Sequence, residues 1–228
     1  AHSFWNNHAA QNLTEKSDFK AGMLIDDQDL AQIRKEIEEY HFNHLIKLKA
    51  TDQVLELGCG SGAYLAFYAG LHPDHRCVGI DFDEQVVADA QQALRTQPVR
   101  VGDGRHARCE VQLGDMRDAA TWPEGPFDVI TAHQNVYYFD ADRRAQLWRD
   151  CADRLTGNGQ LVVVTPTSGG PMSDYFALLL LSTAGCYSLP TIEELVAEVQ
   201  AVGFAVTQRE RLIPGDSVWG LSARVRNR

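Results

Sequence analysis

Apolar and polar positions alternate along the chain in two periods, one typical of short buried strands and the other typical of helices. Five apolar runs predict strands, at 53–57, 77–81, 109–113, 127–132 and 161–165. Helical spacing follows three of them, over 62–70, 84–96 and 142–155. Asp83 can cap the second helix, and Gly157-Asn158-Gly159 is expected to end the third. This alternation predicts a mostly parallel sheet with helices on both faces.

The two ends of the chain depart from this alternation. Residues 1–50 precede the first strand, and the apolar positions that follow Asp26-Asp27 predict a helix there. Near the other end, Thr191 and Glu194 have the spacing of a capping box, so a helix should begin there and end near Gly203. The runs 204–212 and 218–225 then predict an antiparallel hairpin around a Pro-Gly-Asp turn.

The first strand ends in a glycine-rich turn, Gly58-Cys59-Gly60-Ser61-Gly62, directly before the first helix. Glycine tolerates positive φ in a tight turn, and its missing Cβ lets a ligand approach the backbone. The turn also directs the free N–H groups of the following helix toward the crevice. The spacing from Gly58 to Ala63 satisfies the dinucleotide fingerprint as well, so the turn alone leaves two cofactor classes open.

With its preceding residues, Val54-Leu55-Glu56-Leu57, the turn resembles the first motif of the class I S-adenosylmethionine-dependent methyltransferases. The resemblance implies an α/β fold with a seven-stranded, mixed but mostly parallel, doubly wound sheet that ends in an antiparallel hairpin. It also implies an N-terminal helical lid over 1–50 and a Rossmann-like domain over 51–228 that binds S-adenosylmethionine. Within this single structural domain, the insertion 167–190 is expected to cover the substrate side.

The resemblance assigns a cofactor role to residues at three strand ends. Glu56 is expected to brace the loop and the methionyl ammonium, while Gly58, Gly60 and Gly62 admit the amino-acid part of the cofactor. Asp81 is expected to bind the ribose hydroxyls, a role that NAD enzymes share, and Phe82 to pack against adenine. Asp115 and the backbone of Met116 are expected to contact the adenine ring. The Gly-Asp-Met sequence after the third strand favours methyltransferases over dehydrogenases.

Candidate catalytic residues follow the fourth strand. His133 has the usual pKa of a general base, although the matching position in the family often only contacts the cofactor. Asn135 can orient an amine or a hydroxyl, and of Tyr137 and Tyr138 at least one is expected to line the pocket. Tyr175, in the insertion, is placed either beside the sulfonium, where a ring attracts a cation, or in ordinary lid packing.

The composition of the chain disfavours several classes of binding partner. The net charge of −10 and the lack of a Lys/Arg block argue against nucleic acid. The five cysteines are scattered, and no His or carboxylate spacing predicts a metal site. The longest apolar stretch is shorter than the roughly 20 residues of a membrane span, and no signal peptide is recognisable. We therefore expect a cytoplasmic monomer or homodimer that acts on a small molecule.

Together these features predict a methyltransferase that uses S-adenosylmethionine to methylate a small polar metabolite. One alternative uses the same cofactor as a cyclase of the azetidine-2-carboxylate synthase type, in which the methionyl amine attacks its own Cγ and methylthioadenosine is released. A second alternative is an NAD-dependent oxidoreductase, and a non-catalytic binding protein also remains open.

Overall fold

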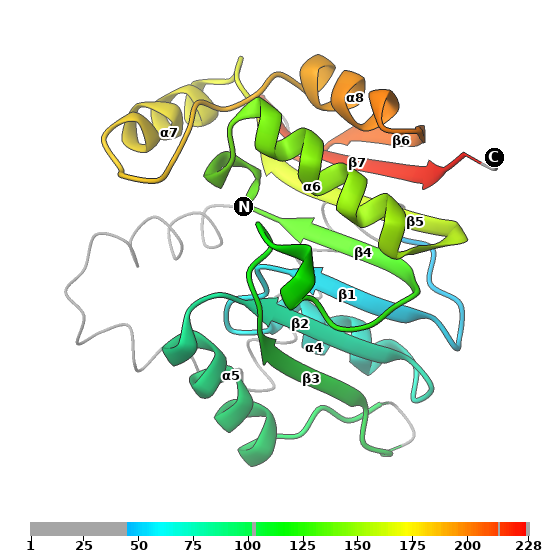
Figure 1. Ribbon diagram of the computed structural model, residues 1–228. Helices are drawn as coiled ribbons and strands as arrows, with labels where there is room; N and C mark the ends of the chain where they lie inside the picture. Colours follow the sequence, from blue (N-terminus) through cyan, green and yellow to red (C-terminus); the bar gives the residue numbers. More distant parts are fainter. Residues whose placement is uncertain (1–44, 102–103, 214, 227–228) are drawn as a thin grey trace.

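The computed structural model describes residues 45–101, 104–213 and 215–226, and it contains a seven-stranded sheet (Figure 1). The strand order is β3-β2-β1-β4-β5-β7-β6. The strands are β1 Gln53–Leu57, β2 Arg76–Asp81, β3 Arg108–Leu113, β4 Phe127–His133, β5 Leu155–Pro166, β6 Phe204–Arg211 and β7 Val218–Val225. The first five strands pair in parallel, whereas β7 pairs antiparallel with both β5 and β6. The predicted mixed, doubly wound sheet is confirmed.

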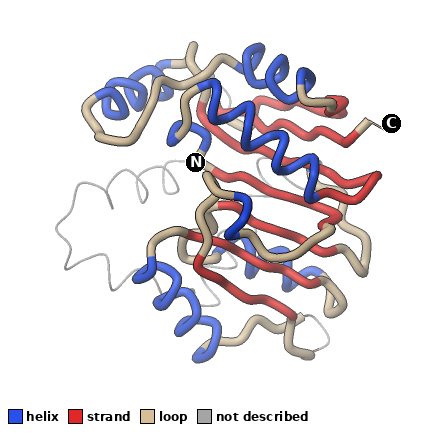
Figure 2. Tube along the Cα trace, viewed as in Figure 1, coloured by secondary structure: helices blue, strands red, loops and turns tan. Residues whose placement is uncertain are grey.

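Helices cover both faces of this sheet (Figure 2). They are α4 Ala63–Leu71, α5 Glu84–Thr96, α6 Ala141–Arg154, α7 Pro171–Leu181 and α8 Ile192–Ala201, with short 3-10 turns η1 Ala119–Thr121 and η2 Val136–Tyr138. The side chain of Asp83 accepts hydrogen bonds from the first turn of α5. Thr191 and Glu194 form the predicted capping box of α8. Local capping signals therefore set the starts of both helices.

Two hydrophobic clusters hold the helices to the sheet. One face packs α6 and α8 around the fully buried Trp148 and Phe127, and the other packs α4 and α5 around Leu65 and Tyr68. Burying a large apolar side chain stabilises the fold by about 1.5–3 kcal/mol. The central strands β1, β2 and β4 are mostly buried for this reason, whereas the residues of the edge strand β3 are mostly half-buried or exposed.

The fifth strand is longer than the sequence pattern predicts. The expected strand at 161–165 begins instead at Leu155, directly after α6, so Gly157-Asn158-Gly159 lies inside β5 and does not end the helix. The pairing of β4 with β5 is irregular between Phe127 and Val129. A Cβ on Gly159 would lie 2.8 Å from the Cβ of Leu155, so glycine permits this local bend.

The predicted N-terminal helical lid lies almost entirely outside the described residues, which begin at Leu45. Leu45 is fully buried, and a Cβ on Gly220 of β7 would clash with its side chain. The carboxamide of Gln160 in β5 donates a hydrogen bond to the carbonyl of Leu45 and accepts one from the N–H of Lys47. The chain therefore enters the domain fastened to β5 and β7. Within the described ranges, no helix is long and apolar enough to cross a bilayer.

Candidate functional site

A cavity of about 570 Å³ opens at the carboxyl ends of the parallel strands. Its walls come from residues within 56–64, 81–82, 114–117 and 133–139, together with Phe176, Ala184 and Gly185. The strand order reverses between β1 and β4, and a crevice forms where the connections leave the sheet in opposite directions. The cavity therefore lies at the place where open α/β sheets bind ligands.

The glycine turn forms the floor of this cavity. Gly58, Gly60 and Gly62 have φ values of 63°, 52° and 77°, which favour glycine over other residues. A Cβ on Gly58 would lie 3.0 Å from the amide nitrogen of Asn135 and 3.4 Å from the sulfur of Met116. Gly62 is the N-cap of α4, and no side chain caps this helix end. The turn is thus an open backbone surface at a helix N-terminus.

Asp81 joins the glycine turn to the start of α5. One carboxylate oxygen accepts a hydrogen bond from the N–H of Gly60 at 3.0 Å, and the other accepts one from the N–H of Asp83 at 3.1 Å. Phe82 follows with 65 % of its surface exposed, although it is a large apolar side chain. A fixed carboxylate beside an exposed ring suits a ligand with hydroxyl groups attached to a flat heterocycle.

Two buried acceptors lie beside the glycine turn. The Glu56 carboxyl is 1 % exposed, and one of its oxygens has no hydrogen-bond partner among the described residues. Burial raises its pKa well above the usual range, the N–H of Leu65 counteracts this, and the negative charge of Asp81 raises it further. Asn135 donates a hydrogen bond to the carbonyl of Leu57 at 2.6 Å, and within the described chain its own oxygen is also unpartnered.

These orphaned acceptors fit a cofactor that carries an ammonium group, because a buried acceptor is costly unless a donor reaches it. The methionyl end of S-adenosylmethionine has such a group. The residues of the site therefore fit the cofactor that the resemblance implies.

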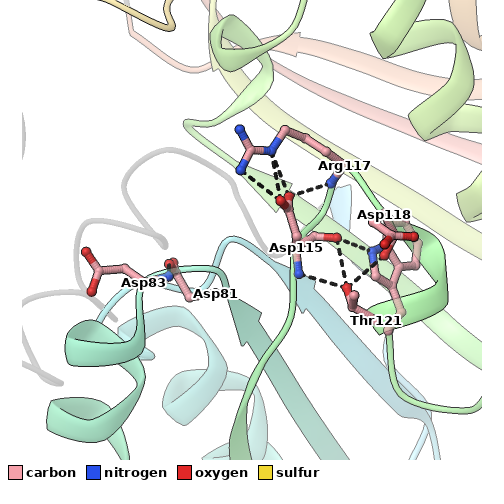
Figure 3. Close-up of polar contacts among 7 residues, drawn as sticks. Asp81, Asp83, Asp115, Arg117, Asp118 and Thr121 are labelled. Atoms are coloured by element: carbon pink, nitrogen blue, oxygen red, sulfur yellow. Dashed lines mark hydrogen bonds and ion pairs between the residues drawn. The ribbon is translucent and has the colours of Figure 1, made fainter.

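The structure gives Asp115 a partner that the sequence pattern did not indicate. The Arg117 guanidinium contacts both carboxylate oxygens, with Nε 2.8 and 3.0 Å away and one terminal nitrogen at 2.8 Å, and the Arg117 N–H donates as well (Figure 3). This pairing lowers the pKa of Asp115. Arg117 also lies over the Phe82 ring, 5.1 Å from its centroid. In the sequence, the basic residue two positions after Asp115 was the signal that could have predicted this ion pair.

The structure argues against His133 as a general base. Its ring is buried, lies 2.9 Å from the Tyr68 hydroxyl through Nε2, and packs at 4.6 Å against the ring of Tyr64. Burial lowers the pKa of His133 to about 3, so the imidazole is neutral at pH 7 and a weak base. Its position favours the other expected role, contact with the cofactor.

An aromatic compartment forms the other half of the cavity. Tyr137 packs edge-on against Phe176 of α7 at 5.3 Å, and its carbonyl accepts a hydrogen bond from the N–H of Tyr187 at 2.8 Å. Tyr138 is 46 % exposed and lines the cavity. Phe176 of α7, with Ala184 and Gly185 in the loop after it, therefore contributes to the wall of this compartment.

Tyr175 does not occupy the position beside the cofactor that was one of the two expected for it. Tyr175 is 61 % exposed and does not line the cavity, whereas its neighbour Phe176 does. Successive residues of a helix point about 100° apart, so only one of the two can face the sheet. Sequence reasoning also overlooked Gln134, which lines the cavity and has a φ of 56°.

Comparisons with known proteins agree with this geometry. Residues 54–159 match the family model described as a methyltransferase domain. The chain is 28% identical over 141 residues to a malonyl-[acyl-carrier protein] O-methyltransferase of Legionella pneumophila, covering 61% of this chain and 45% of that protein. It is 25% identical over 87 residues to an uncharacterized methyltransferase of Schizosaccharomyces pombe, covering 38% and 31%. The chain thus spans less than half the length of the curated relatives it matches.

Solved structures share the whole fold. A putative O-methyltransferase from Nostoc punctiforme superimposes with a TM-score of 0.69 at 20% identity, covering 96% of this chain and 68% of that one. The match over 54–159, the sheet order and the glycine turn at its switch point show a domain that is similar to the methyltransferase domain family and has the fold of the class I methyltransferases, whose cofactor is S-adenosylmethionine.

Proposed function

We propose that this protein transfers a methyl group from S-adenosylmethionine to a small polar metabolite. The observation that carries the proposal is the division of one cavity into two halves. The half beside the glycine turn offers buried acceptors and a carboxylate, and the other is an aromatic compartment under α7. Such a division suits a cofactor and an acceptor that meet at the centre.

The cofactor half is assigned residue by residue within a single domain over 51–228. Glu56 and Asn135 bind the ammonium group, and the glycine turn admits the amino-acid part. Asp81 binds the ribose hydroxyls. The adenine ring lies near Phe82, Asp115 and Met116, with Arg117 holding the Asp115 carboxylate in place. When bound, the cofactor supplies an electrophilic methyl group on a sulfonium.

The protein's own contribution to this chemistry is alignment and exclusion of water. A displacement at carbon needs the nucleophile in line with the leaving sulfur, and orientation of bound partners lowers the barrier by several kcal/mol. The neutral His133 and the amide of Asn135 orient polar groups without adding charge. The cavity wall contributed by Phe176, Ala184 and Gly185 within the insertion 167–190 supports a small acceptor, and the net charge of −10 disfavours nucleic acid.

Incubation of the protein with S-adenosylmethionine alone tests this proposal. A methyltransferase without its acceptor should form little product, and it should release S-adenosylhomocysteine once an acceptor is supplied. Mass spectrometry of the adenosine product distinguishes the outcomes. Enzyme-dependent release of methylthioadenosine from the cofactor alone, above its spontaneous decay, would replace methyl transfer by intramolecular cyclisation.

A further inference from the structure

Gln134 has a backbone conformation that needs an explanation. Its φ of 56° is the one positive value outside glycine in the described chain. This left-handed conformation is unfavourable for a residue with a Cβ, and it persists only where the surroundings enforce it. Here the N–H of Gln134 donates to the carbonyl of Val164 on β5 at 2.8 Å, and the next side chain, Asn135, donates to Leu57 on β1. The chain is therefore fastened to both neighbouring strands at the switch point.

The side chain of Gln134 carries a second unfavourable feature. Its carboxamide oxygen is buried and has no hydrogen-bond partner in the part of the chain that the structure describes, although the residue lines the cavity. A buried acceptor without a hydrogen bond is destabilising, so a donor group on a ligand would supply the hydrogen bond that the folded protein lacks. A strained backbone and an orphaned acceptor in one residue at a cavity indicate a ligand-binding role.

The location of Gln134 indicates which ligand it faces. The side chain of Asn135 points toward the glycine turn, because its amide lies against Gly58 and Leu57. Gln134 is instead fastened to β5, the strand that leads into α7 and the aromatic compartment. Tyr138 and Phe176 line this compartment, together with the small residues Ala184 and Gly185.

We propose that Gln134 is a specificity-determining residue for the acceptor. Its carboxamide oxygen accepts a hydrogen bond from a hydroxyl or N–H group on a planar ring acceptor, and the ring packs against Tyr138 and Phe176. This inference rests on the proposed methyl transfer and narrows its substrate class to hydroxylated or aminated ring compounds. Sites built around a buried polar group reject analogues that lack the matching donor, because the protein group is then left unpaired.

Three probes test this assignment in the protein loaded with S-adenosylhomocysteine: phenol, aniline and anisole, which share a ring but differ in the donor. We expect phenol and aniline to bind about tenfold more tightly than anisole in a magnetic-resonance titration, a difference of ~1.4 kcal/mol. Gln134→Met keeps the length of the side chain and removes the acceptor, so the preference should disappear. Gln134→Gly should lose it too, while melting at or above the parent temperature because glycine relieves the strained φ.

Equal binding of anisole and phenol by the parent would overturn the proposal, as would a preference that survives in Gln134→Met. Failure of all three probes to bind the loaded protein would overturn it as well. Each of these outcomes leaves the proposed methyl transfer standing, because binding of S-adenosylhomocysteine is measured first and separately. Failure of S-adenosylhomocysteine itself to bind would remove both proposals together.

Discussion

Among single residues, Glu56 is placed to bind a cationic ligand, and its burial lowers the stability of the protein without that ligand. Its carboxyl is buried beside the glycine turn, and burial raises its pKa well above the usual range. A carboxyl group with a raised pKa binds its proton more tightly in the folded than in the unfolded protein. Its contribution to stability is therefore fully present below the ordinary pKa and is lost as the pH rises through the raised value. A cationic ligand beside it would favour the ionised form again.

The variant Glu56→Gln tests this balance. Without ligand, we expect its free energy of unfolding to match the parent near about pH 4 and to exceed it increasingly as the pH rises, since an amide has no proton to lose. The same variant should bind S-adenosylmethionine more weakly, because the ammonium group loses its charged partner. Urea unfolding across the pH range and calorimetry measure the two effects. A stability difference that does not vary with pH would contradict the raised pKa.

Among the elements, α6 and α8 are joined by an ion pair that also supports the site. The Arg144 guanidinium contacts Glu198 at 2.7 and 3.0 Å, with side-chain exposures of 7% and 15%. Its remaining terminal nitrogen donates to the carbonyl of Phe139 at 2.9 Å, and Phe139 lines the cavity directly after η2. The indole of Trp148 donates to the same Glu198. Helix packing on one face therefore holds a cavity wall in place.

We expect Glu198→Ala to lower the free energy of unfolding by about 3 kcal/mol, because the substitution leaves a buried guanidinium without its counter-charge. The matched control is Arg209→Ala, which removes an exposed ion pair with Glu193 of the same helix, at 3.7 Å and with exposures of 52% and 73%. That change should stay within roughly 0.5 kcal/mol. Chemical denaturation compares the two, and equal losses would contradict the special role of the buried pair.

At the scale of the whole molecule, cofactor binding should stabilise the fold. The cavity is built from the ends of β1, β2, β3 and β4, so a ligand there joins segments that are far apart in the chain. A ligand present at 100 times its dissociation constant stabilises the folded state by about 2.7 kcal/mol. In a domain of this size, each kcal/mol corresponds to roughly 2–4 °C in Tm.

S-adenosylhomocysteine should accordingly raise the Tm by several degrees, whereas NAD should not. Asp81→Ala should remove most of this rise, since its carboxylate faces the proposed ribose site. Asp83→Ala is the matched control: it deletes the cap of α5, which costs about 1 kcal/mol of stability, yet the ligand-induced rise should persist. Thermal unfolding with each ligand measures both variants. Stabilisation by NAD alone would contradict the proposed cofactor site.

The sequence by itself determined the features that depend on near neighbours in the chain. The strands at 53–57 and 218–225, the cap of α5 and the capping box of α8 are all where the pattern predicts them. Hydrophobic periodicity, capping side chains and the need of a tight turn for glycine act within a few residues, so a single sequence displays them. The glycine turn followed from the same local signals, whereas the seven-stranded mixed sheet was expected from the resemblance to methyltransferases and its strand order came from the structure.

Tertiary structure alone decided the features that depend on distant neighbours. The start of β5 at Leu155 depends on pairing with β4, and the pKa of His133 depends on burial by α4 and the sheet. Phe176, in place of Tyr175, faces the cavity because of how α7 rests on η2. The strained φ of Gln134 is imposed by β5 and β1 together. These properties arise from contacts between segments far apart in the sequence, where hydrophobic period and local propensity carry no information.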